Sequence, residues 1–283
     1  MRVKLWGVRG SIPVPGSAAA GFGGNTSCVQ VTTERGTELI LDAGSGIREL
    51  GHALVGRRRP IDILVTHLHI DHILGLVFFA PFFDPDAEVT VWGPPAAGRA
   101  LRERLARYIS NPLSPIDIHE LPAKVTFRDA MPTPWRISDI QVTASLVAHR
   151  GPTLGYRLEA DGAALCYLPD HEPSLGQNLA TSTPEWISGH GLARRASLLI
   201  HDCQYTDDEY RGHRGWGHSS ISDALAFAIR CEPGHVQLFH HDPAHDDARL
   251  ASIGNGAAQQ LEGLGCDAAI EMAKEGRVIT LAN

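Results

Sequence analysis

Short apolar or alternating segments, separated by glycine and proline, recur along the whole chain. Ile61–Thr66, for example, has the sequence Ile-Asp-Ile-Leu-Val-Thr and is typical of a buried strand. Runs of this length, bounded by turn-forming residues, favour strands over helices. The predicted strands are Val3–Val8, Ser27–Thr32, Glu38–Leu41, Ile61–Thr66, Glu88–Trp92, Lys124–Phe127, Gln141–Ala144, Thr153–Leu158, Ala163–Leu168, Ser197–Ile200 and Val236–Phe239.

Longer segments with apolar residues at helical spacing are fewer. The predicted helices are Ala96–Ser110, Ser220–Ile229 (with Ser220 and Asp223 at its start) and Ala244–Leu264. The last segment, Ile270–Leu281, is predicted to be a closing strand or a hairpin around Glu275-Gly276. Since no linker or low-complexity segment divides the chain, we predict one domain over residues 1–283. Its class is α/β: two mixed β-sheets packed face to face with helices outside, an αββα sandwich.

Composition and charge exclude several classes of protein. Hydrophobic residues make up 43% of the chain and charged residues 20%, an ordinary balance for a globular protein. The formal net charge is −7, so we expect no extended nucleic-acid surface. The most apolar run, Ile73 to Phe83, is too short to span a bilayer, and no membrane association is expected. Five cysteines without a C-x-x-C pair indicate reduced thiols and a cytoplasmic protein.

Histidine is the anomaly, with 15 residues in the chain. The sequence Thr-His-Leu-His-Ile-Asp-His, residues 66–72, follows a predicted buried strand directly. A turn at this point can direct His67 and His69 toward one ion, and Asp71 and His72 toward a second ion. Two metal ions need further ligands, and the candidates are polar residues that follow later strands. These candidates are His149, Asp170 and His240.

Together these motifs resemble the metallo-β-lactamase-fold hydrolases, and in particular their phosphodiesterase branch related to tRNase Z. The resemblance extends over nearly the whole chain. It rests on T-H-L-H-I-D-H, on L-I-L-D-A-G-S-G at 39–46, A-H-R-G at 148–151, Y-L-P-D-H at 167–171, G-H-S-S at 217–220 and L-F-H-H-D-P at 238–243. The opening W-G-V-R-G-S-I-P with G-G-N-T-S-C looks like an uncharacterised bacterial subgroup, so the substrate of any one relative does not carry over.

The resemblance implies roles for individual residues. His67, His69 and His149 would bind one metal, Asp71, His72 and His240 the second, and Asp170 would bridge both. Asp42 would support the ligands from behind or serve the structure, and His201 is a candidate for a similar supporting role. His218 would be the general acid and, with the metal-bound Asp71, makes up the predicted catalytic residues. Two divalent ions are expected, with zinc as the first choice and manganese or iron as alternatives. The family analogy also allows a homodimer.

The chain departs from tRNase Z in one informative place. In that family a long arm that grips tRNA lies between the third histidine and the bridging aspartate. Here the interval from His149 to Asp170 is 21 residues, enough only for a hairpin. Asp170 also stands where the commonest β-lactamases have a cysteine, which argues against β-lactam hydrolysis.

Other polar residues near these motifs have open roles. The segment 207–217 can be read as a mobile surface loop or as a flap whose Arg214 and Trp216 contact an anionic substrate. Asn25, in the glycine-rich stretch Gly21–Asn25, is a third candidate substrate contact. The sequence leaves the roles of His171, His213 and His241 undecided, although the family pattern favours His240 over His241 as the inward-facing residue.

These observations predict a binuclear metal hydrolase. The preferred function is a phosphodiesterase that acts on a small or cyclic phosphodiester through a metal-bridging hydroxide. A metallo-hydrolase of an ester, thioester or lactone is the first alternative. A non-catalytic, metal-dependent binding or sensor protein is the second.

Overall fold

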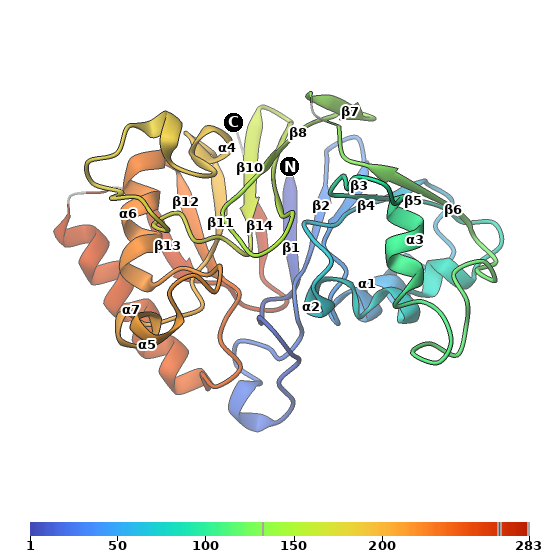
Figure 1. Cartoon of the computed structure of the whole chain (residues 1–283), viewed down its shortest axis with the longest axis horizontal. Helices are drawn as coiled ribbons and strands as arrows, with labels where there is room; N and C mark the ends of the chain where they lie inside the picture. The colour runs from blue at the N-terminus through green and yellow to red at the C-terminus, as the bar shows by residue number, and fades with distance from the viewer. Residues whose placement is uncertain (132, 265, 267, 282–283) are drawn as a thin grey trace.

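The computed structural model describes residues 1–131, 133–264, 266 and 268–281. Within these residues the strands form two seven-stranded sheets that face each other (Figure 1). The first sheet is largely parallel in its second half, where β3, β4, β5 and β6 run in the same direction. Its order is β14 (Val278–Thr280), β1 (Arg2–Gly7), β2 (Cys28–Thr32), β3 (Glu38–Leu41), β4 (Ile61–Leu64), β5 (Glu88–Gly93) and β6 (Lys124–Asp129).

The second sheet repeats this mixture of parallel and antiparallel pairs. Strands β10 to β13 are parallel neighbours, and β7 to β10 form an antiparallel meander. Its order is β13 (Ala269–Met272), β12 (His235–Phe239), β11 (Leu198–Asp202), β10 (Ala163–Leu168), β9 (Leu154–Ala160), β8 (Ile140–Leu146) and β7 (Trp135–Ile137).

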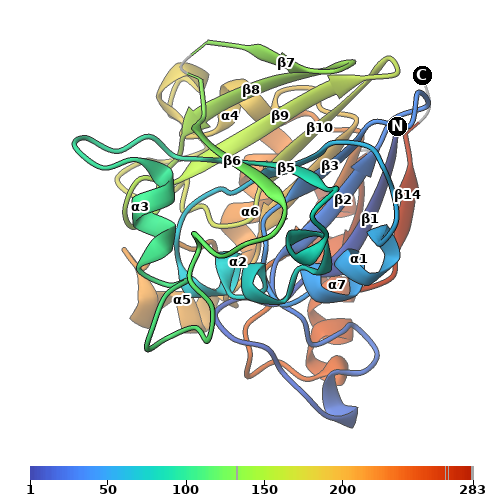
Figure 2. The same cartoon turned by 90° about the vertical axis from the view of Figure 1, so that its right-hand side faces the viewer.

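Helices cover the outer faces of both sheets. On the first sheet lie α1 (Ile47–Leu54), α2 (Ile70–Ile73) and α3 (Leu101–Ala106), as Figure 2 shows from that side. On the side of the second sheet lie α4 (His190–Ala193), α5 (Asp207–His213), α6 (Ile221–Cys231) and α7 (Asp247–Gly263). Short 3-10 turns are η1 (Ser17–Ala19), η2 (Leu76–Phe78), η3 (Ala80–Phe83) and η4 (Pro184–Trp186).

The buried side chains follow the same layers. Alternate residues of β1 and β2, such as Val3 and Val31, pack between the sheets against Tyr156 and Leu165 of the second sheet. The other faces of the strands pack against helices, in one cluster under α1 and α3 and two more under α4, α6 and α7. The period of two along a strand puts one face of each sheet in the shared core and the other under helices. The predicted αββα sandwich is confirmed.

Three of the expected segments differ in the structure, and α1, α4 and β7 were not expected. The segment around Glu275 is not a hairpin, because β13 pairs with β12 in the second sheet and β14 pairs with β1 in the first. The helix predicted over 96–110 is reduced to α3, since Gly98 adopts a left-handed φ of 78° just before it. The segment 207–217, for which a mobile loop and a flap were both open, begins with a regular helix, α5, which starts with a capping box at Thr206 and Glu209.

No helix among the described residues is long and apolar enough to cross a membrane. The five cysteines are all free thiols, and four of them are buried.

Candidate metal centre

The donor residues follow the carboxyl ends of strands from both sheets. His67 lies three residues after β4, Asp170 two residues after β10, and His240 directly after β12. Carboxyl ends of neighbouring parallel strands meet at one edge of a sheet, and the face-to-face packing of the two sheets brings both edges together. His149 comes from the connection between β8 and β9. The sandwich therefore collects these side chains at one place.

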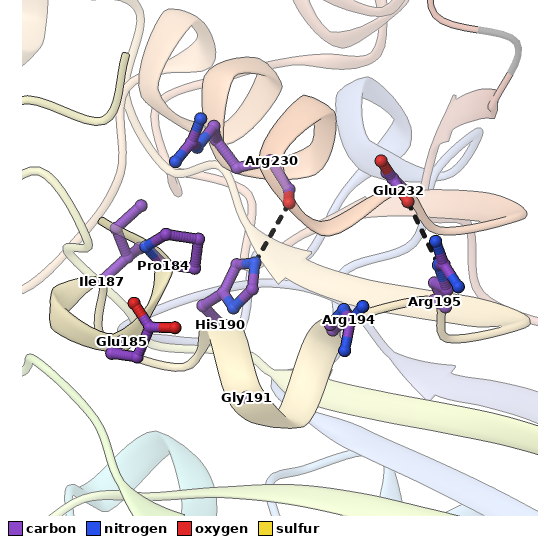
Figure 3. Close-up of a pocket in the computed structure, with 9 residues that line it drawn as sticks. All are labelled: Pro184, Glu185, Ile187, His190, Gly191, Arg194, Arg195, Arg230 and Glu232. Atoms are coloured by element: carbon purple, nitrogen blue, oxygen red, sulfur yellow. Dashed lines mark hydrogen bonds and ion pairs between the residues drawn. The ribbon is translucent and has the colours of Figure 1, made fainter. Parts of the chain in front are cut away.

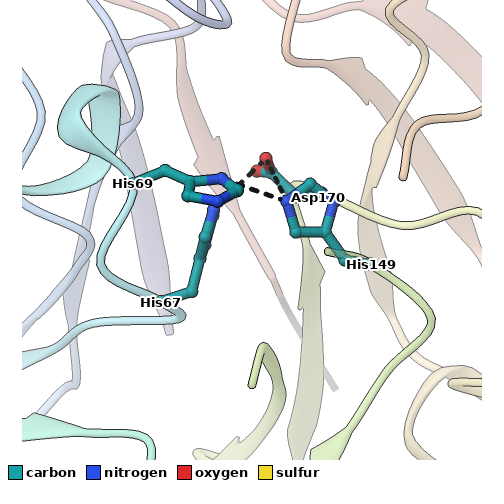
Figure 4. Close-up of side chains that lie close together, drawn as sticks. All are labelled: His67, His69, His149 and Asp170. Atoms are coloured by element: carbon teal, nitrogen blue, oxygen red, sulfur yellow. Dashed lines mark hydrogen bonds and ion pairs between the residues drawn. The ribbon is translucent and has the colours of Figure 1, made fainter. Parts of the chain in front are cut away.

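The first group of donors consists of His67, His69, His149 and Asp170, whose side chains converge in Figure 4. His149 Nε2 lies 3.2 Å from His69 Nδ1. Asp170 Oδ2 lies 3.6 Å from His67 Nε2 and 3.7 Å from His149 Nε2. These separations suit donors that surround one ion, because ligands at about 2.0–2.1 Å from zinc lie about 3.3 Å apart in a tetrahedron.

The second group consists of Asp71, His72 and His240. His240 Nε2 is 3.2 Å from Asp71 Oδ2, and His72 Nε2 is 3.4 Å from the same oxygen. Asp170 presents its other oxygen to this group, with Oδ1 at 2.9 Å from His72 Nε2 and 3.3 Å from His240 Nε2. One carboxylate thus faces both groups with different oxygens, which is the arrangement of a bridging ligand.

Several buried donor atoms have few partners within the protein itself. Nε2 of His67 is buried without a hydrogen bond, and Nε2 of His72 and Oδ1 of Asp170 are buried facing each other at 2.9 Å. Burial of polar atoms without well-formed hydrogen bonds is costly, and metal ions in the two groups would satisfy these atoms. Imidazole nitrogens with carboxylate oxygens form a donor set that suits zinc and other first-row divalent metals. The residues present therefore fit divalent metal ions.

The surroundings place most of these groups in the protonation state that binds metal. Burial lowers the pKa of His67, His69 and His149, so these rings are neutral at neutral pH. Burial alone would raise the pKa of Asp170, but His240, His72 and His67 hold it well below its usual value. Neutral imidazole and ionised carboxylate are the metal-binding forms.

His72 is the exception among the donors. Burial would lower its pKa, but Asp170, Asp71 and Asp42 raise it well above the ordinary value. Without metal, His72 therefore carries an extra proton among three carboxylates. A cation at the second group takes over the role of that proton and displaces it from Nε2.

Hydrogen bonds from behind fix the orientation of the imidazoles. His72 Nδ1 donates to Asp42 Oδ2 at 2.8 Å, and Tyr167 in the opposite sheet donates its hydroxyl to the same oxygen at 3.0 Å. His149 Nδ1 donates to the carbonyl of Gly217 at 2.7 Å. His240 Nδ1 donates to Oε1 of Gln204 at 3.1 Å. Each bond leaves Nε2 pointing to the centre, as metal-binding histidines require.

Asp71 and His240 are also covered by the N-terminal segment. The backbone N–H of Ser11 donates to Asp71 Oδ2 at 2.7 Å. A Cβ on Gly10 would lie 2.4 Å from His240 Nδ1, so only glycine fits at this position. His240 and Asp42 both have left-handed backbone angles, with φ of 60° and 59°. Strained non-glycine residues of this kind gather at functional sites.

His218 lies beside the metal groups and is paired with a carboxylate. Its Nδ1 donates to Asp202 Oδ2 at 2.7 Å, and its ring stacks on His240 with centroids 4.9 Å apart. Burial would lower the pKa of His218, but the Asp202 carboxylate raises it to about 9. The ring is thus protonated at neutral pH before metal binds. His218 also lies close enough to Asp170 and His240 to form a third donor group, so a ligand role is the alternative to an acid role.

The three candidate substrate contacts differ in their surroundings. Arg214 and Trp216 are exposed and follow α5, and Trp216 packs edge-on against His213 at 5.0 Å. The side chain of Asn25 is engaged at both ends: its Oδ1 accepts from Ser45 Oγ at 2.8 Å, and its Nδ2 donates to Glu275 at 3.2 Å. These bonds fix the glycine-rich turn.

The remaining histidines point elsewhere. His201 donates from Nδ1 to the carbonyl of Asp202 at 2.7 Å, contacts His171 and stacks on Phe227. His241 turns away from the centre, and its Nε2 donates to the carbonyl of Ala273 at 2.7 Å. His213 donates to the carbonyl of Glu209, inside α5.

Sequence reasoning missed three polar residues that the structure brings to the site: Asp202, Gln204 and Glu172. Asp202 and Gln204 follow His201 at the end of β11. A polar residue at the end of a buried strand is the signal that identified Asp170, and it could have identified these two residues as well. Glu172 is two residues from Asp170 but is 0% exposed, a placement that its charge gave no reason to expect.

A separate cavity of about 720 Å³ lies beside α4 (Figure 3). Three arginines line it, but Arg195 is paired with Glu232 at 3.2 Å and Arg230 extends away from the other two. None of the metal-donor side chains lines this cavity. Among the described residues, the histidine and aspartate side chains that could bind metal gather at the histidine cluster and not at this cavity.

Comparison with known proteins agrees with this geometry. Residues 37–241 match the family model described as beta-lactamase superfamily domain. The chain is 29% identical to a ribonuclease Z of Mycobacterium marinum, over 86% of this chain and 87% of the relative. It is 27% identical to a ribonuclease Z of Kineococcus radiotolerans, over 81% and 82%.

Solved structures show the same fold. Human tRNase Z, short form, superposes with a TM-score of 0.69 at 21% identity and full coverage of both chains. The metallo-beta-lactamase fold protein YhfI from Bacillus subtilis gives 0.70 at 17% identity, with 99% of each chain covered. A diphosphatase from the PhnP family gives 0.70 at 18% identity, with 99% of this chain and 97% of the other covered. The chain therefore has the metallo-β-lactamase fold, belongs to the beta-lactamase superfamily, and is a metal-dependent hydrolase of that family.

Proposed function

We propose that the chain is a binuclear, zinc-dependent phosphodiesterase that acts on a small or cyclic phosphodiester. The observation that carries the proposal is the position of Asp170, whose two oxygens face two separate groups of histidines, with the His218–Asp202 pair beside them. The relatives named ribonuclease Z support a phosphodiester as the bond that is cleaved.

The chain's own residues have distinct tasks in this reaction. The seven donors hold two cations which, when bound, lower the pKa of a water and offset negative charge on the phosphate oxygens. His218 holds a proton on Nε2 while its Nδ1 is fixed by Asp202. It delivers that proton to the leaving alkoxide, which is too basic to depart easily alone. Such general acid catalysis contributes about 10²–10⁴-fold.

The small size of the substrate is argued from the β9–β10 hairpin. The two strands are joined by a tight turn at Asp161 and Gly162, whose positive φ angles of 51° and 70° fit a two-residue hairpin turn. No arm for gripping RNA extends between His149 and Asp170. The net charge of −7 provides no compensating attraction for a long polyanion. A compact diester, held by the metals and by Arg214 and Trp216, fits these features best.

The test is a panel of substrates with zinc-loaded enzyme: a bis-aryl phosphodiester, cyclic nucleotides, precursor tRNA, a thioester, a lactone and a β-lactam. Fastest turnover of a small diester is the expected result. Faster, position-specific cleavage of precursor tRNA would refute the small substrate. Turnover of the thioester or lactone alone would refute the phosphodiesterase and favour the alternative hydrolase of an ester, thioester or lactone.

The role of His218 is tested on the same panel. His218→Ala should keep both metals and lose about 10²-fold or more with an alkoxide leaving group, but much less with nitrophenolate, which needs no proton. Loss of metal in this variant would instead identify His218 as a ligand.

A further inference from the structure

Glu172 is a fully buried carboxylate that the reaction described above does not use. It is 0% exposed and accepts three hydrogen bonds. Its Oε1 accepts from the N–H of Gly215 at 2.7 Å and from the Tyr210 hydroxyl at 2.8 Å. Its Oε2 accepts from the N–H of Gly217 at 2.8 Å. A buried carboxylate bound to two backbone amides of one short loop fixes that loop strongly.

The loop that Glu172 holds touches the metal centre on one side and solvent on the other. Gly215 and Gly217 both have left-handed φ angles, 82° and 97°, and they flank the exposed Trp216. The carbonyl of Gly217 is the acceptor for His149 Nδ1 at 2.7 Å. A Cβ on Gly217 would lie 2.3 Å from the same nitrogen, so the backbone approaches the ring as closely as it can.

Glu172 also joins the segments that carry other parts of the site. It follows the bridging Asp170 by two residues, and its own N–H donates to the carbonyl of Ala148 at 2.8 Å, next to His149. Its side chain reaches the loop that leads directly into His218. One residue therefore ties together three stretches of chain that each supply a functional side chain.

We propose that Glu172 is a positioning residue for the metal centre and for Trp216. By fixing residues 215–217, it directs the Gly217 carbonyl at His149, which turns Nε2 of that ring to the first metal. The same contacts fix the position of Trp216, which directly precedes Gly217. The exposed ring of Trp216 can then stack on a planar group of the substrate. The substrate part of this inference rests on the proposed function, whereas the part about His149 does not.

Glu172→Gln tests this role with almost no change in shape. The two loop N–H groups donate to different oxygens of Glu172, and an amide keeps only one of these oxygens, so its NH₂ group faces one of the N–H groups as a second donor. Tyr210→Phe is the matched control, because it removes a hydrogen bond to the same carboxylate but leaves both bonds to the loop. Gly215→Ala strains the loop independently, since φ is 82° there and a Cβ would meet open space.

The first readout is metal affinity, measured with Co²⁺ at each site in isolation. Asp71→Ala removes a ligand of the second site, so this background reports on the first site. His69→Ala removes a ligand of the first site, so this background reports on the second. Glu172→Gln and Gly215→Ala should weaken the first site by about 10- to 100-fold, the usual effect of losing a partner that orients a ligand. The second site should be unchanged, and Tyr210→Phe should match the parent at both sites. Equal losses at both sites, or no loss at the first, would overturn the inference.

The second readout is the fluorescence of Trp216, taken as the difference from a Trp216→Phe background. Glu172→Gln should raise the acrylamide quenching constant of this residue, and Tyr210→Phe should not. A constant unchanged in Glu172→Gln would refute the role of Glu172 in fixing the position of Trp216. Neither readout needs a substrate, so failure of the phosphodiesterase proposal would leave both results interpretable. If Glu172→Gln does not fold, Gly215→Ala carries both tests, because a Cβ at this position would contact no other atom.

Discussion

Removal of the carboxylate behind His218 should move the pH dependence of the reaction in a direction that the structure fixes. In Asp202→Asn the hydrogen bond to His218 Nδ1 can persist, but the negative charge at 2.7 Å is lost. That charge is the main cause that raises the pKa of His218 from 6.5 to about 9 against the opposing effect of burial. Since the burial remains when this charge is lost, the pKa should fall from about 9 to near or below the ordinary value of 6.5. Each unit of this fall corresponds to about 1.4 kcal/mol.

The sign of the effect on activity follows from the form that reacts. A general acid works when protonated, so cleavage is fast below its pKa and slows as the pH rises through it. Bound cations lower the pKa of His218 in the wild type and the variant alike, so the comparison between them isolates Asp202. The basic limb of the profile should begin at lower pH in Asp202→Asn, with a deficit that grows as the pH rises.

The assay is kcat/KM against pH for zinc-loaded wild type and Asp202→Asn, with an alkyl and a nitrophenyl diester. The shift should occur with the alkyl leaving group and nearly vanish with nitrophenolate. An unmoved basic limb, or the same shift with both substrates, would refute the assignment of the proton to His218. Metal content measured at each pH serves as the control for loss of ligands.

Three further predictions concern the metal groups and their support. Elemental analysis of Asp71→Ala should give about one equivalent of metal per chain against two in the wild type, because only the second group contains this carboxylate; two retained equivalents would contradict the ligand set. On acidification, metal at the second group should leave first, since carboxylates raise the pKa of His72 whereas burial lowers the pKa of His67, His69 and His149; Co²⁺ spectra during a pH titration of the single-site variants check this order. Tyr167→Phe should cost about 1.5–3 kcal/mol of unfolding free energy in urea, the contribution of a hydrogen bond to a charged group, and an unchanged midpoint would show that its bond to Asp42 is worth little.

The sequence predicted the positions of individual strands better than it predicted which strands pair with each other. Glu38–Leu41 and Ala163–Leu168 form strands with the expected bounds, because a short apolar run between turn residues has few other solutions. The pattern carries no information on which sheet a strand joins. Glu275-Gly276 therefore suggested a hairpin, although the strands on either side belong to different sheets.

The same limit applies to the site. Local spacing made the donors at 67–72 evident, and the strand-end rule pointed to Asp170 and His240. The contacts that orient these donors come from the backbone of distant loops, as with the Gly217 carbonyl, and leave no mark in the sequence. One local signal was available and overlooked: Thr206 and Glu209 have the spacing of a capping box, which marks the start of α5 within the segment 207–217.

The donors of the metal centre extend from His67 to His240 and come from both sheets. During synthesis the N-terminal part of a chain emerges first, so the histidines after β4 leave the ribosome long before Asp170 and His240. An incomplete nascent chain contains only some of the metal donors. Tight metal binding therefore requires that the second sheet has packed on the first. A cation that joins both sheets then acts as a cross-link between the two halves of the sandwich. Every metal-loaded molecule in a preparation is therefore one in which the two sheets have already packed together.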